Sequence, residues 1–144
     1  CELMFNQKYE DRLQMWSVFR QSLETSVDPL QDVVANYGQA PTVSNHTDAY
    51  NKDTWPTPWE LIQENQYCEF CIVLGQCYSL QLTERFKGVD FEIHISVDKE
   101  KAKDVYLLHT QERVIGYDKY KHVCKNELPK TIETQIKYPM PKIQ

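Results

Sequence analysis

The sequence predicts an α+β domain in which N-terminal helices and a buried central helix pack on a short antiparallel sheet. Over residues 5–23 the apolar side chains recur every three or four positions, which is the period of a helix that buries one side. After Gly88 apolar and polar residues alternate, which is the period of a half-buried strand. A chain of 144 residues with 41% hydrophobic content has the size of one ordinary domain.

The first predicted helix has an aromatic apolar stripe. Its members are Phe5, Tyr9, Leu13, Trp16, Phe19 and Leu23. Such a stripe either packs on its own domain or docks onto a partner subunit, because large aromatic side chains dominate protein interfaces. The candidate interface residues are Tyr9, Leu13, Trp16 and Phe19.

Two further helices are predicted from their capping residues. The Asp-Pro pair at 28–29 begins one of them, and Gly38 is placed to end it. Residues 39–56 have no periodicity and indicate a long loop. Thr57 and Glu60 then form the two halves of a capping box, which predicts a short helix.

The central helix and the sheet follow in the second half of the chain. Residues 67–82 are apolar on every side, so we expect this helix in the middle of the domain. Residues 89–98 alternate as a strand, and residues 105–109 and 113–117 are predicted to form a hairpin.

The pattern divides the chain into one domain and an arm. Residues 1–124 form a single α+β domain, with a helical part over 1–38, the long loop over 39–56 and a core over 57–124. Residues 125–144 lose hydrophobic density and are broken by prolines, so we expect an extended C-terminal arm.

Charge and hydropathy exclude several classes of protein. Sixteen basic and 21 acidic residues give a net charge of −5, which argues against a nucleic-acid or anionic-membrane binder. The mean hydropathy is −0.62, and no run of residues is long and apolar enough to span a membrane. The N-terminus shows no basic region followed by an apolar core, so we expect no signal peptide and mostly reduced cysteines.

The cysteines leave several chemistries open. Cys68 and Cys71 form a C-x-x-C pair, which is used by redox proteins and by zinc sites. A redox fold would place a strand directly before the pair, where this chain has a capped helix and a polar linker. A zinc site would need Cys77, His94 or Cys124 as further ligands, without a second closely spaced pair. Burial in an apolar helix is the simplest interpretation, and we expect neither a metal nor a cofactor.

A last interpretation makes Cys68 a nucleophile at a helix N-terminus. A thiolate needs a nearby base and a third group that orients the base. The candidate bases are His94 and His109, and the candidate orienting group is Asp118.

Three segments here resemble a known family. They are Trp55-Pro-Thr-Pro-Trp-Glu60, the Tyr67-Cys-Glu-Phe70 turn that opens the apolar helix, and the strand that ends in Tyr117-Asp118. Together they are similar to the transglutaminase-like group of the papain-like cysteine superfamily, above all its small tailed-phage members. The resemblance covers residues 54–118 and implies that the nucleophile position is Cys68 and the acid Asp118.

The chain departs from the family at two positions. The Gly-Asp pair before the cysteine is replaced by Gln66-Tyr67, and the family's histidine falls on the segment Asp104-Val-Tyr106. A cysteine without a well-placed base is a weak nucleophile. The resemblance therefore implies the transglutaminase-like scaffold for the core over 57–124, with a degraded catalytic triad.

We therefore expect a non-enzymatic structural or interaction protein of a tailed-phage virion, as a neck, tail or baseplate accessory component. Its partners would be other virion or assembly proteins, a second copy of the chain among them, rather than nucleic acid or a membrane. The expected location is the virion or the host cytoplasm. The alternative is a cysteine hydrolase or acyltransferase that uses Cys68, with His94 as base and Asp118 orienting it.

Overall fold

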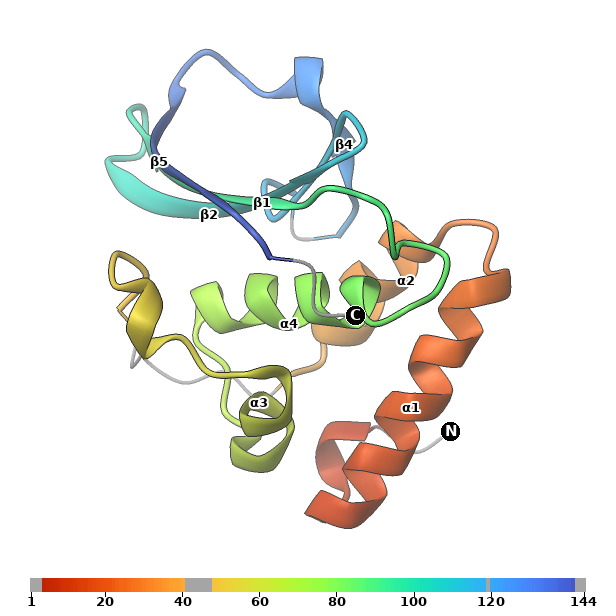
Figure 1. Ribbon diagram of the computed structural model, residues 1–144. Helices are drawn as coiled ribbons and strands as arrows, with labels where there is room; N and C mark the ends of the chain where they lie inside the picture. Colours follow the sequence, from red (N-terminus) through yellow and green to blue (C-terminus); the bar gives the residue numbers. More distant parts are fainter. Residues whose placement is uncertain (1–3, 41–47, 119, 142–144) are drawn as a thin grey trace.

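A layer of helices covers one face of an antiparallel sheet (Figure 1). This computed structural model describes residues 4–40, 48–118 and 120–141. Its α-helices are α1 (Tyr9–Thr25), α2 (Pro29–Tyr37), α3 (Pro58–Glu64) and α4 (Glu69–Gln81). Its strands are β1 (Glu92–Asp98), β2 (Lys103–Thr110), β3 (Arg113–Ile115), β4 (Val123–Cys124) and β5 (Ile132–Pro139). The predicted α+β class is confirmed.

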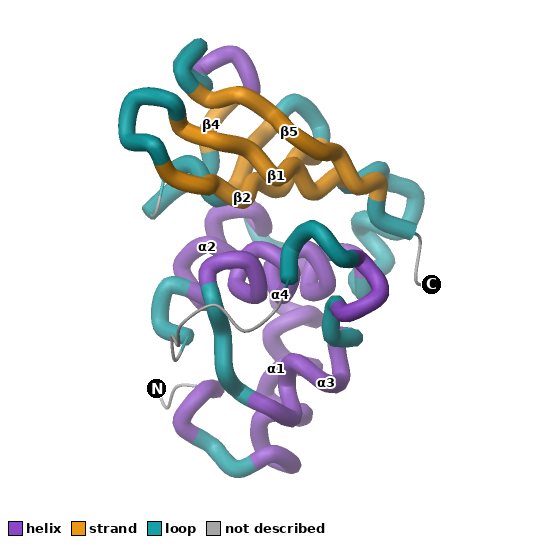
Figure 2. The backbone as a smooth tube through the Cα atoms, turned by 90° about the vertical axis from the view of Figure 1, so that its left-hand side faces the viewer, coloured by secondary structure: helices purple, strands orange, loops and turns teal. Residues whose placement is uncertain are grey.

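Helix α4 lies at the centre of the molecule, between the sheet and the other helices (Figure 2). Every residue of α4 except Glu69 and Ile72 is buried. An apolar surface all round a helix can leave water only if other elements cover each side. The predicted burial of this helix is therefore confirmed.

The predicted helix starts are present as side-chain caps. Asp28 accepts a hydrogen bond of 3.2 Å from the backbone N–H of Gln31 at the start of α2. At the start of α3, Thr57 accepts from the backbone N–H of Glu60 at 3.2 Å. The Glu60 carboxylate accepts in return from the Thr57 N–H at 3.1 Å. These bonds satisfy N–H groups that the first turn of a helix leaves without partners.

The aromatic stripe of α1 packs partly inward, and of the four candidate interface residues Trp16 belongs to the core. Trp16 is 1% exposed, and its indole N–H donates to the Ser79 hydroxyl of α4 at 2.9 Å. Leu13 and Phe19 are partly buried against the same core, whereas Tyr9 remains 38% exposed. The reason is that α4 needs cover on this side, and the stripe of α1 provides it.

The sheet has the strand order β4-β3-β2-β1-β5. Within it, β1 and β2 pair antiparallel over their common length, and β3 follows β2 across a tight turn. Gln111 and Glu112 form that turn with positive φ angles of 50° and 65°. The predicted hairpin is present, although β3 ends two residues earlier than expected.

The C-terminal segment belongs to the sheet, which corrects the prediction of an arm beginning at residue 125. Strand β5 pairs antiparallel with β1 from Ile132 to Pro139, with one register shift between Ile95 and Ser96. The low hydrophobic density of this segment is typical of an edge strand, which buries part of one face only. A proline at its end is also tolerated at a sheet edge.

We expect Trp16→Ala to lower the free energy of unfolding by about 3–5 kcal/mol, because it removes a buried aromatic side chain and a hydrogen bond to α4. Urea denaturation measures this loss. The matched control is Val18→Ala on the same helix, where the side chain is 59% exposed and the loss should be small. If the Trp16→Ala variant were instead a stable monomer that no longer bound a partner, Trp16 would be an interface residue.

Candidate functional site

The two faces of the sheet carry different side chains because successive residues of a strand point to opposite sides. The inner face contributes Ile93, Ile95, Leu108 and Ile115 to the main core around α4. The outer face has a smaller apolar cluster made of Leu107, Val114 and Val123. The two faces therefore decide which candidate catalytic residues can lie close to one another.

Cys68 lies on the inner side, in the main core. It is the N-cap of α4, with extended backbone angles, and its side chain is 0% exposed. The neighbouring Tyr106 on β2 is close enough to interact with it. Burial raises the pKa of Tyr106, and Asp104, Tyr50 and then Cys68 raise it further. Tyr106 thus stands in the segment where the family resemblance places a histidine.

His94 lies on the opposite face of the sheet. Its two neighbours on β1 are Ile93 and Ile95, which face α4, so the imidazole points to the outer side. There Nε2 lies 3.0 Å from the Glu92 carboxylate, and the ring stacks on His109 with centroids 3.6 Å apart. The second candidate base, His109, therefore shares this outer face.

The predicted Cys68–His94–Asp118 triad is corrected by this arrangement. The sheet itself stands between the Cys68 thiol and both imidazoles. Asp118 lies beyond β3, where its Oδ1 accepts a 2.8 Å hydrogen bond from the backbone N–H of Tyr120. The physical reason is strand alternation: a shift of one residue along β1 would turn His94 inward, but it would also expose the apolar residues that cover α4.

His94 is set up as a neutral imidazole. Burial lowers its pKa, and the hydrogen bond to Glu92 only partly opposes this effect. The geometry assigns Nε2–H as the donor to Glu92, which leaves Nδ1 to accept from the Thr134 hydroxyl at 3.4 Å. Burial, and to a lesser extent the neighbouring His94, lowers the pKa of His109 to about 4. The pair is a polar network that joins β1, β2 and β5.

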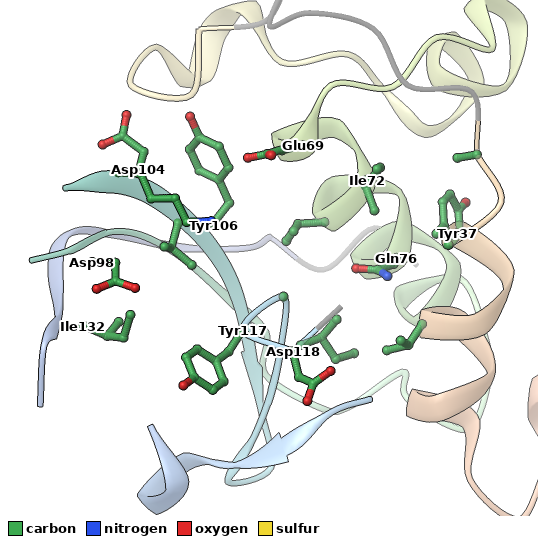
Figure 3. Close-up of a pocket in the computed structure, with 18 of the residues that line it drawn as sticks. Tyr37, Glu69, Ile72, Gln76, Asp98, Asp104, Tyr106, Tyr117, Asp118 and Ile132 are labelled. Carbon is green, nitrogen blue, oxygen red and sulfur yellow. The ribbon is translucent and has the colours of Figure 1, made fainter. Parts of the chain in front are cut away.

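An open groove lies between α4, the end of α2 and the start of β2 (Figure 3). The cavity has a volume of about 570 Å³. Its charged lining residues are the four acids Glu69, Asp98, Asp104 and Asp118 and the two lysines Lys101 and Lys103. Its aromatic lining residues are Tyr37, Tyr106 and Tyr117. The groove is therefore acidic and aromatic.

The sequence prediction found only Asp118 among these groove residues. The missed signal is the polar residues in α4: Glu69 and Gln76 are seven positions apart, so they lie on one face of an otherwise apolar helix. A polar face on an otherwise apolar helix indicates that this side of the helix is not covered by apolar core residues. The groove residues from β2 could not be predicted from a sequence pattern, because the pattern does not say which strand lies beside α4.

The redox and zinc chemistries that the cysteine pattern left open have less support in the geometry. No disulfide joins the cysteines that the structure describes, which are Cys68, Cys71, Cys77 and Cys124. Burial raises the pKa of the Cys77 thiol, as expected of a cysteine packed as a small apolar side chain. Among the described residues, no three His, Cys, Asp or Glu side chains are grouped to hold a metal ion. In the same residues, no helix has the length and apolar character to cross a membrane.

Comparison with known proteins assigns no family. No family model matches the sequence, and no curated protein matches it. The chain is therefore described by its fold and by its candidate site. The chain is an α+β domain with a fully buried cysteine at the start of its central helix and an acidic, aromatic groove along that helix.

We expect stability to fall as the pH is lowered from 7 to 5.5. The pKa values of His109 and His94 are lowered in the folded chain, so below about pH 6.5 the unfolded chain binds protons that the folded chain does not. Stability is therefore full above this pH and decreases as the pH falls towards the folded pKa of His109, about 4. Urea denaturation should show a loss of about 1 kcal/mol from His109 across the interval.

The control for this measurement is His109→Gln, which keeps a polar side chain on the outer face and removes one titrating group. Its loss of stability over the same pH interval should be smaller. Glu92 does not titrate there, because the hydrogen bond from His94 holds its pKa below the usual range. An equal loss in the variant and the parent protein would contradict the role of His109.

Proposed function

We propose that this chain is a non-enzymatic structural or interaction protein of a tailed-phage virion, built on a transglutaminase-like scaffold. The observation that carries the proposal is the environment of Cys68. The cysteine begins a buried helix that packs on an antiparallel sheet, as the resemblance implies, but Tyr106 on β2 is its neighbour where the family has a histidine.

The chemistry of Cys68 supports the non-enzymatic part of the proposal. A catalytic thiol must be reached by substrate and must transfer its proton to a base at hydrogen-bond distance. The Cys68 side chain is 0% exposed, and His94 is on the far face of the sheet. A thiol in apolar surroundings also favours its protonated, unreactive form.

The surface supports the interaction part of the proposal. Large exposed side chains of the described residues are Tyr9, Val18, Val27, Tyr50, Trp59, Tyr117 and Tyr120. Five of the seven are aromatic residues, which are enriched where proteins bind one another. Tyr117 also lines the groove, so aromatic surface and concave surface coincide there. A component held by neighbouring virion proteins would use such surfaces.

We expect Cys68 to resist alkylation by chloroacetamide in the native protein. Its side chain is buried, whereas Cys124 is partly exposed and serves as the internal control. Mass spectrometry after a short reaction should find Cys124 modified well before Cys68, and both modified in denaturing urea. Modification of Cys68 in the native protein as fast as in urea would show a reactive thiol and sink the proposal.

The virion assignment has its own test. Peptide mass spectrometry of purified particles of the encoding phage should detect the chain, and chemical cross-linking should join it to other virion proteins. The control is a preparation of particles from which the gene has been deleted. Absence of the chain from intact particles would contradict a structural role in the virion.

A further inference from the structure

We propose that the groove beside α4 binds an extended peptide segment of a partner protein. The peptide pairs with the open edge of β2 and places a lysine or arginine side chain between Glu69 and Asp104. The inference rests on the proposed function, because it names the chemistry of the partner that an interaction protein would bind.

The first argument is the open edge of β2. On one side, β2 pairs with β1 from Lys103 onwards. On the other side, it pairs with β3 only over Leu108–Thr110. No described strand pairs with the first half of β2 on that side. Unpaired backbone groups on a strand edge are a template for an added strand.

The chain after β3 closes the far end of this edge. Gly116 has a φ of +110°, and a Cβ atom there would lie 2.4 Å from the carbonyl oxygen of Tyr106. Only glycine fits such a close approach with this backbone angle. Beyond it, Tyr117 and Asp118 line the groove instead of continuing the strand. The open stretch is therefore a short slot that ends at Tyr106.

The second argument is a pair of carboxylates around an aromatic ring. Figure 3 shows Asp104 and Glu69 on either side of Tyr106, one from β2 and the other from α4. Both carboxylates help to raise the pKa of Tyr106 after burial, so both lie close to it. Two carboxylates and a tyrosine ring attract a side-chain cation by charge and by the cation–π interaction.

The other two acids of the groove already accept hydrogen bonds from the backbone. Asp98 Oδ1 already accepts from the backbone N–H of Glu100 at 3.0 Å, and Asp118 accepts from Tyr120. In the described residues, no ion pair engages Glu69 or Asp104. Lys101 and Lys103 also line the groove and would repel a cation placed close to either ammonium group.

The third argument is a buried acceptor without a partner. Gln76 is 5% exposed and lines the groove from α4. Its Nε2 lies 3.5 Å from the carbonyl of Val33, but its Oε1 has no hydrogen-bond partner among the described residues. A buried acceptor left in this state is unfavourable. A ligand that donates an N–H to Oε1 would remove this cost.

The spacing of these groups fits an extended chain. Glu69 and Gln76 are seven residues apart on α4, which is about 10 Å along the helix axis. An extended peptide covers that distance in about three residues. One strand segment can therefore put a cationic side chain at the Glu69 end and an N–H donor near Gln76. A small cation alone would satisfy only the first of these sites.

The test uses a fluorescent seven-residue peptide of alternating valine and threonine with a central lysine. Two matched peptides carry glutamate in place of lysine, or N-methyl groups that prevent strand pairing. Fluorescence polarisation should show that each change weakens binding about tenfold or more. In ¹⁵N NMR spectra, the lysine peptide should shift the amides of β2 near Asp104 and leave those of β5, the opposite edge strand, unchanged.

Variants of the full chain test the named residues. Glu69→Gln and Asp104→Asn should each weaken binding of the lysine peptide several-fold, and neither should weaken binding of the glutamate peptide. The control is Glu112→Gln, an exposed acid in the β2–β3 turn, which should bind as the parent chain does. Thermal denaturation of each variant checks that the fold is retained.

Three results would overturn the inference. They are equal binding of the lysine and glutamate peptides, shifts confined to β5, and displacement of the lysine peptide by free lysine amide at the peptide's own concentration. The proposed function fails separately, if Cys68 is reactive or the chain is absent from virions. A chain found in virions with an unreactive Cys68 but no preference for the lysine peptide would reject this inference alone.

Discussion

The structure depends on the need to cover α4 on every side. Polar groups of α4 also need hydrogen bonds inside the core, and the Ser79 hydroxyl makes three such contacts. The Ser79 hydroxyl accepts from Trp16, lies 3.0 Å from the Tyr37 hydroxyl and donates to the Gly75 carbonyl. A Cβ atom at Gly75 would lie 2.7 Å from the Tyr37 ring, so α2 can approach only because a glycine is there. Helices α1 and α2 are thus fixed to α4 by shape and by hydrogen bonds together.

Covering α4 also decides which chemistry the sheet can offer. The inner face of β1 must be apolar, so its polar residues are placed on the outer face, where His94 stacks on His109. Cys68 remains on the inner side, surrounded by core residues. The residues of a cysteine enzyme are therefore present in the chain but divided by the sheet.

Much of the fold could be predicted from the sequence, because its signals are local. The caps at Asp28 and Thr57 depend on residues three positions away, and the burial of α4 depends on a continuous apolar run. The C-terminal strand could not be predicted in this way. Strand β5 is held by pairing with β1, about forty residues earlier, and an edge strand needs few apolar side chains of its own.

The sequence by itself determined the fold class, the helix starts and the buried central helix, because period and capping act within a few residues. Tertiary structure decided what Trp16, Cys68 and His94 do. The packing of α1 on α4 made Trp16 a core residue, and strand alternation placed His94 on the face away from Cys68. Tertiary structure also decided where the groove lies. Strand β3 is too short to pair with the first half of β2, which leaves that edge beside the groove. Such outcomes depend on which elements become neighbours, and no local pattern contains that information.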